Sequence, residues 1–206
     1  SVQAFLYAIF PWLLAVLKKT DTRRLRCIAA AIFCAQFLFS FAIWKAGLSG
    51  KAVFYLTYLC PLFRAGDFAI SCCMGCLYHS RKEERIPHGA FSLLELAAVL
   101  FSGGCFFIAA RQVGALGAVA FRYNVLFTPS AVLLVWLLAV GKGVISRLLS
   151  AKPFLWLAGL SPYGFLIHQV LIRYMELAAN KLGLTAHPVA WTLTVFLLTL
   201  CLSSFY

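Results

Sequence analysis

The feature that most constrains the fold is the alternation, along the whole chain, of long apolar runs with short and mostly basic segments. Each run approaches the roughly 20 residues that a helix needs to cross the hydrocarbon core of a bilayer. A segment surrounded by lipid must satisfy its own backbone hydrogen bonds, and a helix does so. We therefore predict an all-α fold, a polytopic transmembrane helix bundle of about seven spans. The predicted spans are residues 1–17, 27–44, 61–79, 89–110, 124–140, 153–174 and 189–206.

Composition agrees with a membrane protein. Hydrophobic residues make up 63% of the chain and charged residues 12%, with a mean hydropathy of +0.92. Soluble domains carry about 25% charged residues. The net charge of +12 could suit nucleic acid, but the basic residues lie in short loops between apolar runs, which is typical of cytoplasmic loops. We expect a lipid bilayer as the surroundings and no nucleic-acid partner.

The basic residues also predict the orientation. Counted over alternate loops, Lys and Arg number 11 on one side and 7 on the other, which makes segments 18–26, 80–88 and 141–152 cytoplasmic. The first residue then lies outside, so we expect an odd number of further spans upstream and a sequence truncated at both ends. The prediction is a single transmembrane domain, 1–206, forming the later part of a larger domain in the inner or plasma membrane.

The eight cysteines do not indicate a disulfide framework, because most of them lie inside predicted spans. Cys73 and Cys76 have the spacing of a metal or redox pair. No second Cys or His pair follows nearby, and small residues every three or four positions are ordinary on helix-packing faces. We expect packing at this position and no bound metal.

The most informative polar residue is His168, inside the otherwise apolar segment 160–175. Ser161 followed by Pro162 reads as a helix N-cap with proline in the first turn. Ser161 and His168 are seven residues apart and share a helix face. An ionisable side chain at membrane depth marks a functional site or makes an interhelical hydrogen bond that only aids packing; the residues alone leave both open.

Two further polar pairs map to the outer half of the predicted bundle. Gln3 and Tyr7 are four apart and face one way, either to hold a polar ligand or to bond to a neighbouring helix. Arg64 and Asp67 are three apart and can pair, either as part of a site or simply to neutralise two membrane charges. Glu95 lies near the cytoplasmic end of its span, where we expect it to snorkel to the interface.

Three stretches in this order resemble the acyltransferase 3 family of integral-membrane sugar O-acyltransferases. That family shows W-S-L-S-V-E-x-x-F-Y-L-x-x-P, then P-L-x-R-x-x-E-F-x-x-G-x-x-x-G, then S-Y-x-x-Y-L-x-H. The corresponding stretches here are SVQAFLY at 1–7 with Phe10-Pro11, PLFRAGDF at 61–68 with Gly75, and SPYGFLIH at 161–168. The separations are also similar, and the resemblance covers nearly the whole chain, matching the later helices of the family.

The resemblance implies transfer of an acyl group, commonly acetyl, from a cytoplasmic acyl-CoA to a hydroxyl of a cell-envelope glycan or glycolipid. In the family the presumed catalytic histidine lies on the first helix, upstream of this sequence, so His168 is not that residue. The residues of this chain that would support the site are His168, Arg64, Asp67, Gln3, Tyr7 and Ser161.

The chain departs from the family pattern at several positions. Gln3 and Asp67 stand where the family has glutamate, and Pro162 and Phe165 replace tyrosines. Glutamine cannot exchange a proton as a carboxylate does. The alternative is therefore a non-catalytic membrane module, either a transporter-like bundle or a decayed acyltransferase that binds lipid or glycan. The 206 residues alone are expected to be inactive, because no nucleophile–base pair is evident.

Overall fold

The computed structural model describes residues 2–80, 88–115, 118–182 and 188–204, and over these ranges it contains helices and turns but no strand. The predicted all-α fold is confirmed. The chain forms two compact units, Ser1–Ser146 and Arg147–Tyr206. The elements are α1 (Val2–Leu17), α2 (Thr22–Lys45), α3 (Gly50–Phe54), the π-helical η1 (Tyr55–Leu59), α4 (Pro61–Ser80), α5 (His88–Arg111), α6 (Val119–Arg122), α7 (Thr128–Val140), α8 (Val144–Leu149), α9 (Lys152–Leu182) and α10 (Pro188–Ser203).

Two helices within the described residues, α2 and α5, are long and apolar enough to cross a membrane. The number rises to four if each of two bent pairs counts as one span: α3 and η1 with α4, bent by 41°, and the two halves of α9, bent by 62°. The helices α1 and α7 have 16 and 13 residues, or about 24 and 20 Å at 1.5 Å per residue. They fall short of the roughly 30 Å hydrocarbon core, so the count of seven spans stays a prediction.

Local sequence explains where the helices of the first unit begin and end. Asp21 accepts a hydrogen bond from the backbone N–H of Arg23 at 3.1 Å and caps α2. Cys60 is extended, and α4 begins directly after it at Pro61, a residue suited to a first turn because it has no N–H to satisfy. Gly141 ends α7 with φ of 72°, the left-handed conformation that glycine adopts without strain.

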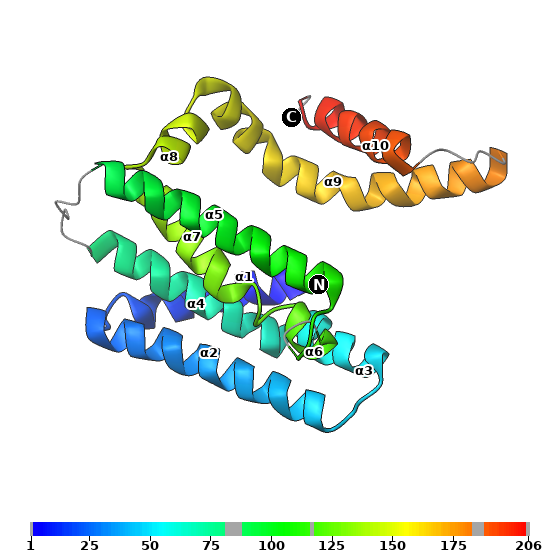
Figure 1. Cartoon of the computed structure of the whole chain (residues 1–206). Helices are drawn as coiled ribbons and strands as arrows, with labels where there is room; N and C mark the ends of the chain where they lie inside the picture. Colours follow the sequence, from blue (N-terminus) through cyan, green and yellow to red (C-terminus); the bar gives the residue numbers. More distant parts are fainter. Residues whose placement is uncertain (1, 81–87, 116–117, 183–187, 205–206) are drawn as a thin grey trace. The chain divides into compact units, whose positions relative to one another are not determined.

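In the first unit, α4 packs against both α1 and α2, and α5 packs against α7 (Figure 1). One apolar core joins the end of α2 to α3, the start of α4 and α6, with Ile43, Val53, Phe63 and Phe121 among its buried residues. A second joins the end of α1, the start of α2 and the end of α4. The two cores therefore lie toward opposite ends of α4.

Helices α4 and α7 run parallel. Asp67, near the start of α4, lies 3.4 Å from the Thr128 hydroxyl at the start of α7. Tyr78, near the end of α4, donates its hydroxyl to the carbonyl of Ala139 at the end of α7, at 2.9 Å. This direction is the one expected if the intervening α5 crosses back through the membrane.

The second unit pairs α9 with α10 (Figure 1). A Cβ placed on Gly164 would lie 3.5 Å from both Ser203 Oγ and Thr199 Cγ2, so the two helices approach closely there. The prediction that Ser161 caps a helix is wrong, because α9 starts at Lys152 and continues through Pro162. Pro153 already occupies the first turn of α9, and Pro162 lies inside the helix, where a proline removes one backbone hydrogen bond.

Candidate functional site

The first turns of α4 hold the predicted ion pair. Arg64 Nη1 lies 3.2 Å from Asp67 Oδ2, and each side chain is 25% exposed, so the pairing predicted from the i, i+3 spacing is confirmed. Arg64 also donates its Nε–H to the carbonyl of Tyr58 at 3.1 Å. Its guanidinium lies 4.6 Å from the centre of the Tyr58 ring, within the range of a cation–π contact. The preceding η1 segment thus holds Arg64 in place.

Hydrogen-bonding groups from three helices lie around the Asp67 carboxylate. Its Oδ2 pairs with Arg64 on α4. Its Oδ1 lies 3.2 Å from Gln36 Nε2 on α2 and 3.4 Å from Thr128 Oγ1 on α7. Gln36 is buried and also donates to the carbonyl of Phe63 at 3.0 Å. The carboxylate of Asp67 therefore joins α2, α4 and α7. We call Gln36, Arg64, Asp67, Asn124 and Thr128 the Asp67 cluster.

Gly66 makes the contact with Gln36 possible. A Cβ at residue 66 would lie 2.5 Å from Gln36 Nε2 and 2.9 Å from its Cδ, closer than side-chain atoms can approach. Since Gln36 is fixed by its two hydrogen bonds, it could not move away without losing them. The glycine in the sequence PLFRAGDF thus lets α2 and α4 approach at this point.

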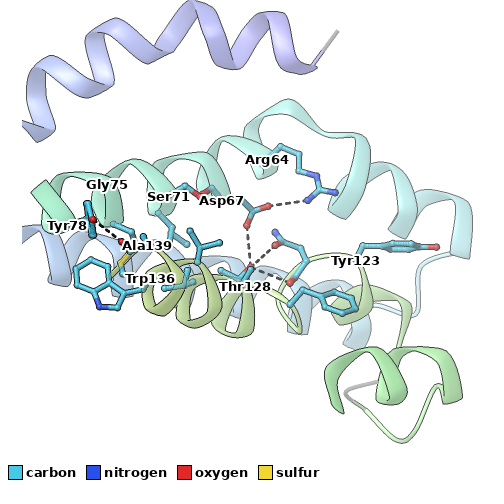
Figure 2. Close-up of a pocket in the computed structure, with 16 residues that line it drawn as sticks. Arg64, Asp67, Ser71, Gly75, Tyr78, Tyr123, Thr128, Trp136 and Ala139 are labelled. Atoms are coloured by element: carbon cyan, nitrogen blue, oxygen red, sulfur yellow. Dashed lines mark hydrogen bonds and ion pairs between the residues drawn. The ribbon is translucent and has the colours of Figure 1, made fainter. Parts of the chain in front are cut away.

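An open cavity of about 440 Å³ lies between α4 and α7. Figure 2 shows Arg64 and Asp67 toward one end of this α4–α7 cavity, and Tyr78, Trp136 and Ala139 toward the other. At that second end the Tyr78 ring meets the Trp136 ring edge-on, with centroids 6.0 Å apart. The remaining lining is mostly apolar and includes Ile70, Met74, Ala131, Val132 and Val135.

Asn124 adds a buried amide to the polar end of this cavity. It lies in the turn before α7, is 4% exposed, and accepts the Thr128 hydroxyl on its Oδ1 at 2.8 Å. Its Nδ2 is buried and has no hydrogen-bond partner among the residues that the structure describes. A buried amide donor left without a partner costs about 1–3 kcal/mol. This atom is therefore suited to bind a ligand oxygen.

A second cavity, of about 670 Å³, lies where α1, the start of α2 and the second half of α4 meet. Its lining includes two thiols, one imidazole and several charged or hydroxyl groups. These residues are Cys72, Cys76, His79, Ser71, Ser80, Lys18, Thr20, Asp21 and Thr22.

Glu95 does not snorkel, so that prediction is wrong. Its side chain is 0% exposed. The carboxylate accepts the backbone N–H groups of Gly143 (3.1 Å), Ile145 (2.9 Å) and Ser146 (3.2 Å) at the start of α8, and Ser92 Oγ accepts that of Val144 at 3.2 Å. The first N–H groups of a helix have no partner within the helix. Two side chains of α5 supply these partners.

Among the described residues, the hydrogen bonds of the Asp67 cluster do not involve Gln3 or Tyr7, the other predicted site residues of the first unit. Gln3 and Tyr7 are exposed on α1, Tyr7 by 72%, and neither is among the described residues that line the two cavities. In the second unit, Ser161 is exposed and His168 is half-buried, with its Nδ1 3.2 Å from the carbonyl oxygen of Gly164. A site shared by His168 and the Arg64–Asp67 pair stays a prediction.

Sequence reasoning missed Gln36, Asn124 and Thr128. Gln36 was the easiest of the three to identify from the sequence, because it is the one amide within the apolar run 27–44. Comparison of the chain with protein-family models, with curated proteins and with solved structures gave no match.

Proposed function

We propose that this chain is the later part of a membrane-bound O-acyltransferase, crossing the inner or plasma membrane about seven times. It would serve transfer of an acyl group, most simply acetyl, from acyl-CoA to a hydroxyl of a cell-envelope glycan or glycolipid. The observation that carries the proposal is the Arg64–Asp67 pair of the PLFRAGDF segment, which sits at the polar end of an open cavity.

The proposed chemistry joins the acceptor oxygen to the acyl carbon and breaks the carbon–sulfur bond of the thioester. The hydroxyl proton passes to a base, and coenzyme A leaves as the thiol. The family resemblance assigns the base to a histidine upstream of these residues. Asp67 would accept a hydrogen bond from an acceptor hydroxyl, and Arg64, held by the Tyr58 carbonyl at 3.1 Å, would fix the direction of that carboxylate.

A second candidate is a non-catalytic module that binds lipid or glycan. It is favoured by the lining of the α4–α7 cavity, in which the described residues include neither a histidine nor a cysteine. Acyl transfer requires a nucleophile or a base close to the reacting atoms. Of the groups that line the cavity, the Asp67 carboxylate is paired with Arg64 and the Ser71 hydroxyl donates to the backbone carbonyl of Asp67. If no upstream helix supplies a base, the cavity would bind without catalysing.

The test is acetyl incorporation into envelope glycan by cells that carry the complete gene. Variants Asp67→Asn, Arg64→Ala and His168→Ala are compared at matched membrane abundance. The control is Arg173→Ala, which removes an ion pair to Glu176 on a side chain that is 79% exposed. We expect the first two to lower transfer at least tenfold, because each breaks the pair that orients the carboxylate; the control should stay near the intact level.

The outcomes separate the two candidates. Transfer that is lost in Asp67→Asn and kept in Arg173→Ala favours the acyltransferase. Absence of transfer from any acyl-CoA offered to the intact gene would refute it and leave the binding module. Retained transfer in His168→Ala would assign His168 to packing against α10.

A further inference from the structure

We infer that the α4–α7 cavity binds a single-chain lipid with a neutral, hydroxyl-bearing head, the head between Asp67 and Asn124 and the chain along α4 toward Trp136. The identification of this lipid as the acyl acceptor rests on the proposed function. The binding itself rests on the chemistry of the two ends of the cavity.

The polar end presents an acceptor and a donor to the same small space. Asp67 offers carboxylate oxygens, and Asn124 offers the buried Nδ2–H that has no partner. Thr128 Oγ1 lies 3.4 Å from Asp67 Oδ1 and 2.8 Å from Asn124 Oδ1, so the carboxylate and the Asn124 amide group are neighbours on either side of the Thr128 hydroxyl. A hydroxyl both donates and accepts, so a head with several hydroxyls can donate one to Asp67 and accept from Asn124 with another.

Charge does not favour an ionic head over a neutral one. Arg64 and Asp67 neutralise each other at 3.2 Å, so the pair carries no net charge. A phosphate that gains attraction from Arg64 meets repulsion from Asp67, and an ammonium that gains attraction from Asp67 meets repulsion from Arg64. A sugar or glycerol head can bond to the polar end without losing the hydration of a charge.

The apolar part of the cavity has a definite length. From Asp67 to Tyr78, and from Thr128 to Ala139, each helix advances eleven residues, or about 16 Å. Tyr78 closes the far end through its hydroxyl bond to Ala139 and its contact with Trp136. An extended alkyl chain with bonds of about 1.5 Å advances roughly 1.25 Å per carbon, so the cavity fits about twelve to thirteen carbons.

Gly75 gives a way to shorten the cavity without disturbing the fold. It lines the α4–α7 cavity between its two ends and borders the second cavity as well, and nothing lies within 4 Å of the position that a Cβ would take there. Gly75→Leu should therefore fill the apolar part and leave the Asp67 cluster intact. Gly103→Leu is the matched control, because residue 103 on α5 is equally open and lines neither cavity.

The experiment uses the chain in phosphatidylcholine nanodiscs without an acyl donor. Alkyl glucosides of about eight to sixteen carbons compete against a dodecyl glucoside that carries a photoreactive group at the chain end. Labelled peptides are then identified by mass spectrometry. We expect the strongest competition at about twelve carbons and labelling near Trp136.

The variants then test each part of the inference. Gly75→Leu should move the optimum to shorter chains, whereas Gly103→Leu should leave it in place. Asn124→Ala, or a glucoside with every hydroxyl methylated, should weaken competition about tenfold, the effect of one lost hydrogen bond. Equal competition by the methylated glucoside, or an unchanged optimum in Gly75→Leu, would overturn the inference and assign the cavity to ordinary bilayer lipid.

The result is separable from the proposed function, since no acyl transfer is measured. Glucoside binding with the expected dependence on head and length supports the inference even where the complete gene transfers no acetyl. Acetyl transfer by the complete gene, combined with no glucoside binding in the cavity, would overturn the inference and leave the acyltransferase proposal standing.

Discussion

Removal of the Glu95 carboxylate should release the start of α8. This side chain is fully buried and accepts three backbone N–H groups from residues 143, 145 and 146. The bonds cross about fifty positions of sequence, so no local structure can replace them. Glu95→Ala takes away the acceptors and leaves the donors in place.

The magnitude follows from how many of those donors water can reach. Gly143 and Ser146 are buried, and Ile145 is half-buried. Two buried N–H groups without partners, at about 1–3 kcal/mol each, give a cost of about 4 kcal/mol. Glu95→Gln retains one acceptor oxygen but turns an NH₂ group toward a backbone donor, so we expect about half of that cost.

Gly143 provides an independent check of the same contact. A Cβ at this residue would overlap the Glu95 carboxylate, so Gly143→Ala should expel the carboxylate and cost about 3 kcal/mol. With Glu95 already replaced by alanine, the space is open and Gly143→Ala should be nearly neutral. The double-mutant cycle should therefore return a coupling of about 2–3 kcal/mol.

The assay is amide hydrogen exchange of the chain in nanodiscs. The N–H of Gly141, which bonds to Leu137 within α7, serves as an internal reference. In Glu95→Ala the amides of residues 143, 145 and 146 should exchange at least a hundredfold faster relative to Gly141, because each 1.4 kcal/mol is a factor of ten. Unchanged exchange, or strictly additive effects of the two substitutions, would refute the reasoning.

Three other outcomes are expected. Gly66→Ala should destabilise the first unit by about 2 kcal/mol, because its Cβ displaces Gln36 from Asp67. Thermal unfolding measures the effect, with Gly104→Ala as the control because its Cβ meets open space. Equal melting temperatures of the two variants would contradict the prediction. Gly141→Ala should cost about 1 kcal/mol, since residue 141 has φ of 72°, and a melting temperature that did not fall would argue against it. An alkaline phosphatase reporter fused in the 46–49 loop should be active and one fused in the 18–21 loop inactive. The reverse pattern would show that the chain has the orientation opposite to the one predicted from charge.

What the sequence could predict depended on how local the interaction is. The Arg64–Asp67 pair was predictable because three residues along a helix bring two side chains onto one face. Gln36 reaches Asp67 from 31 positions away. As the one amide in the run 27–44 it indicates a polar face of that helix, but the sequence does not say which other helix that face meets. The helices could thus be predicted from hydropathy, but their partners could not.

Glu95 and Pro162 were misinterpreted for the same reason, since each was judged only by its immediate neighbours. A carboxylate near the end of a span usually reaches the interface, yet Glu95 finds backbone donors in the segment after α7. The one local indication was the pair of glycines around Lys142, which allows that segment to approach α5. Pro162 after a serine resembles a helix start, yet Pro153 already occupies that position in α9.

The arrangement of the first unit bears on the orientation predicted from charge. Leu17, Leu25 and Leu77 share one buried core, so the end of α1, the start of α2 and the end of α4 lie together. Tyr78 bonds to Ala139 at the end of α7, which brings residue 140 to the same end. The three basic segments that follow residues 17, 79 and 140 therefore begin on one side of the unit. The Asp67 cluster lies toward the opposite end of α4, away from the basic side. If the basic side is cytoplasmic, as the charge count predicts, a hydroxyl bound at the Asp67 cluster would be approached from outside the cell. The acyl transfer that we propose, from a cytoplasmic acyl-CoA, would then require the acyl group to cross the bundle along α4.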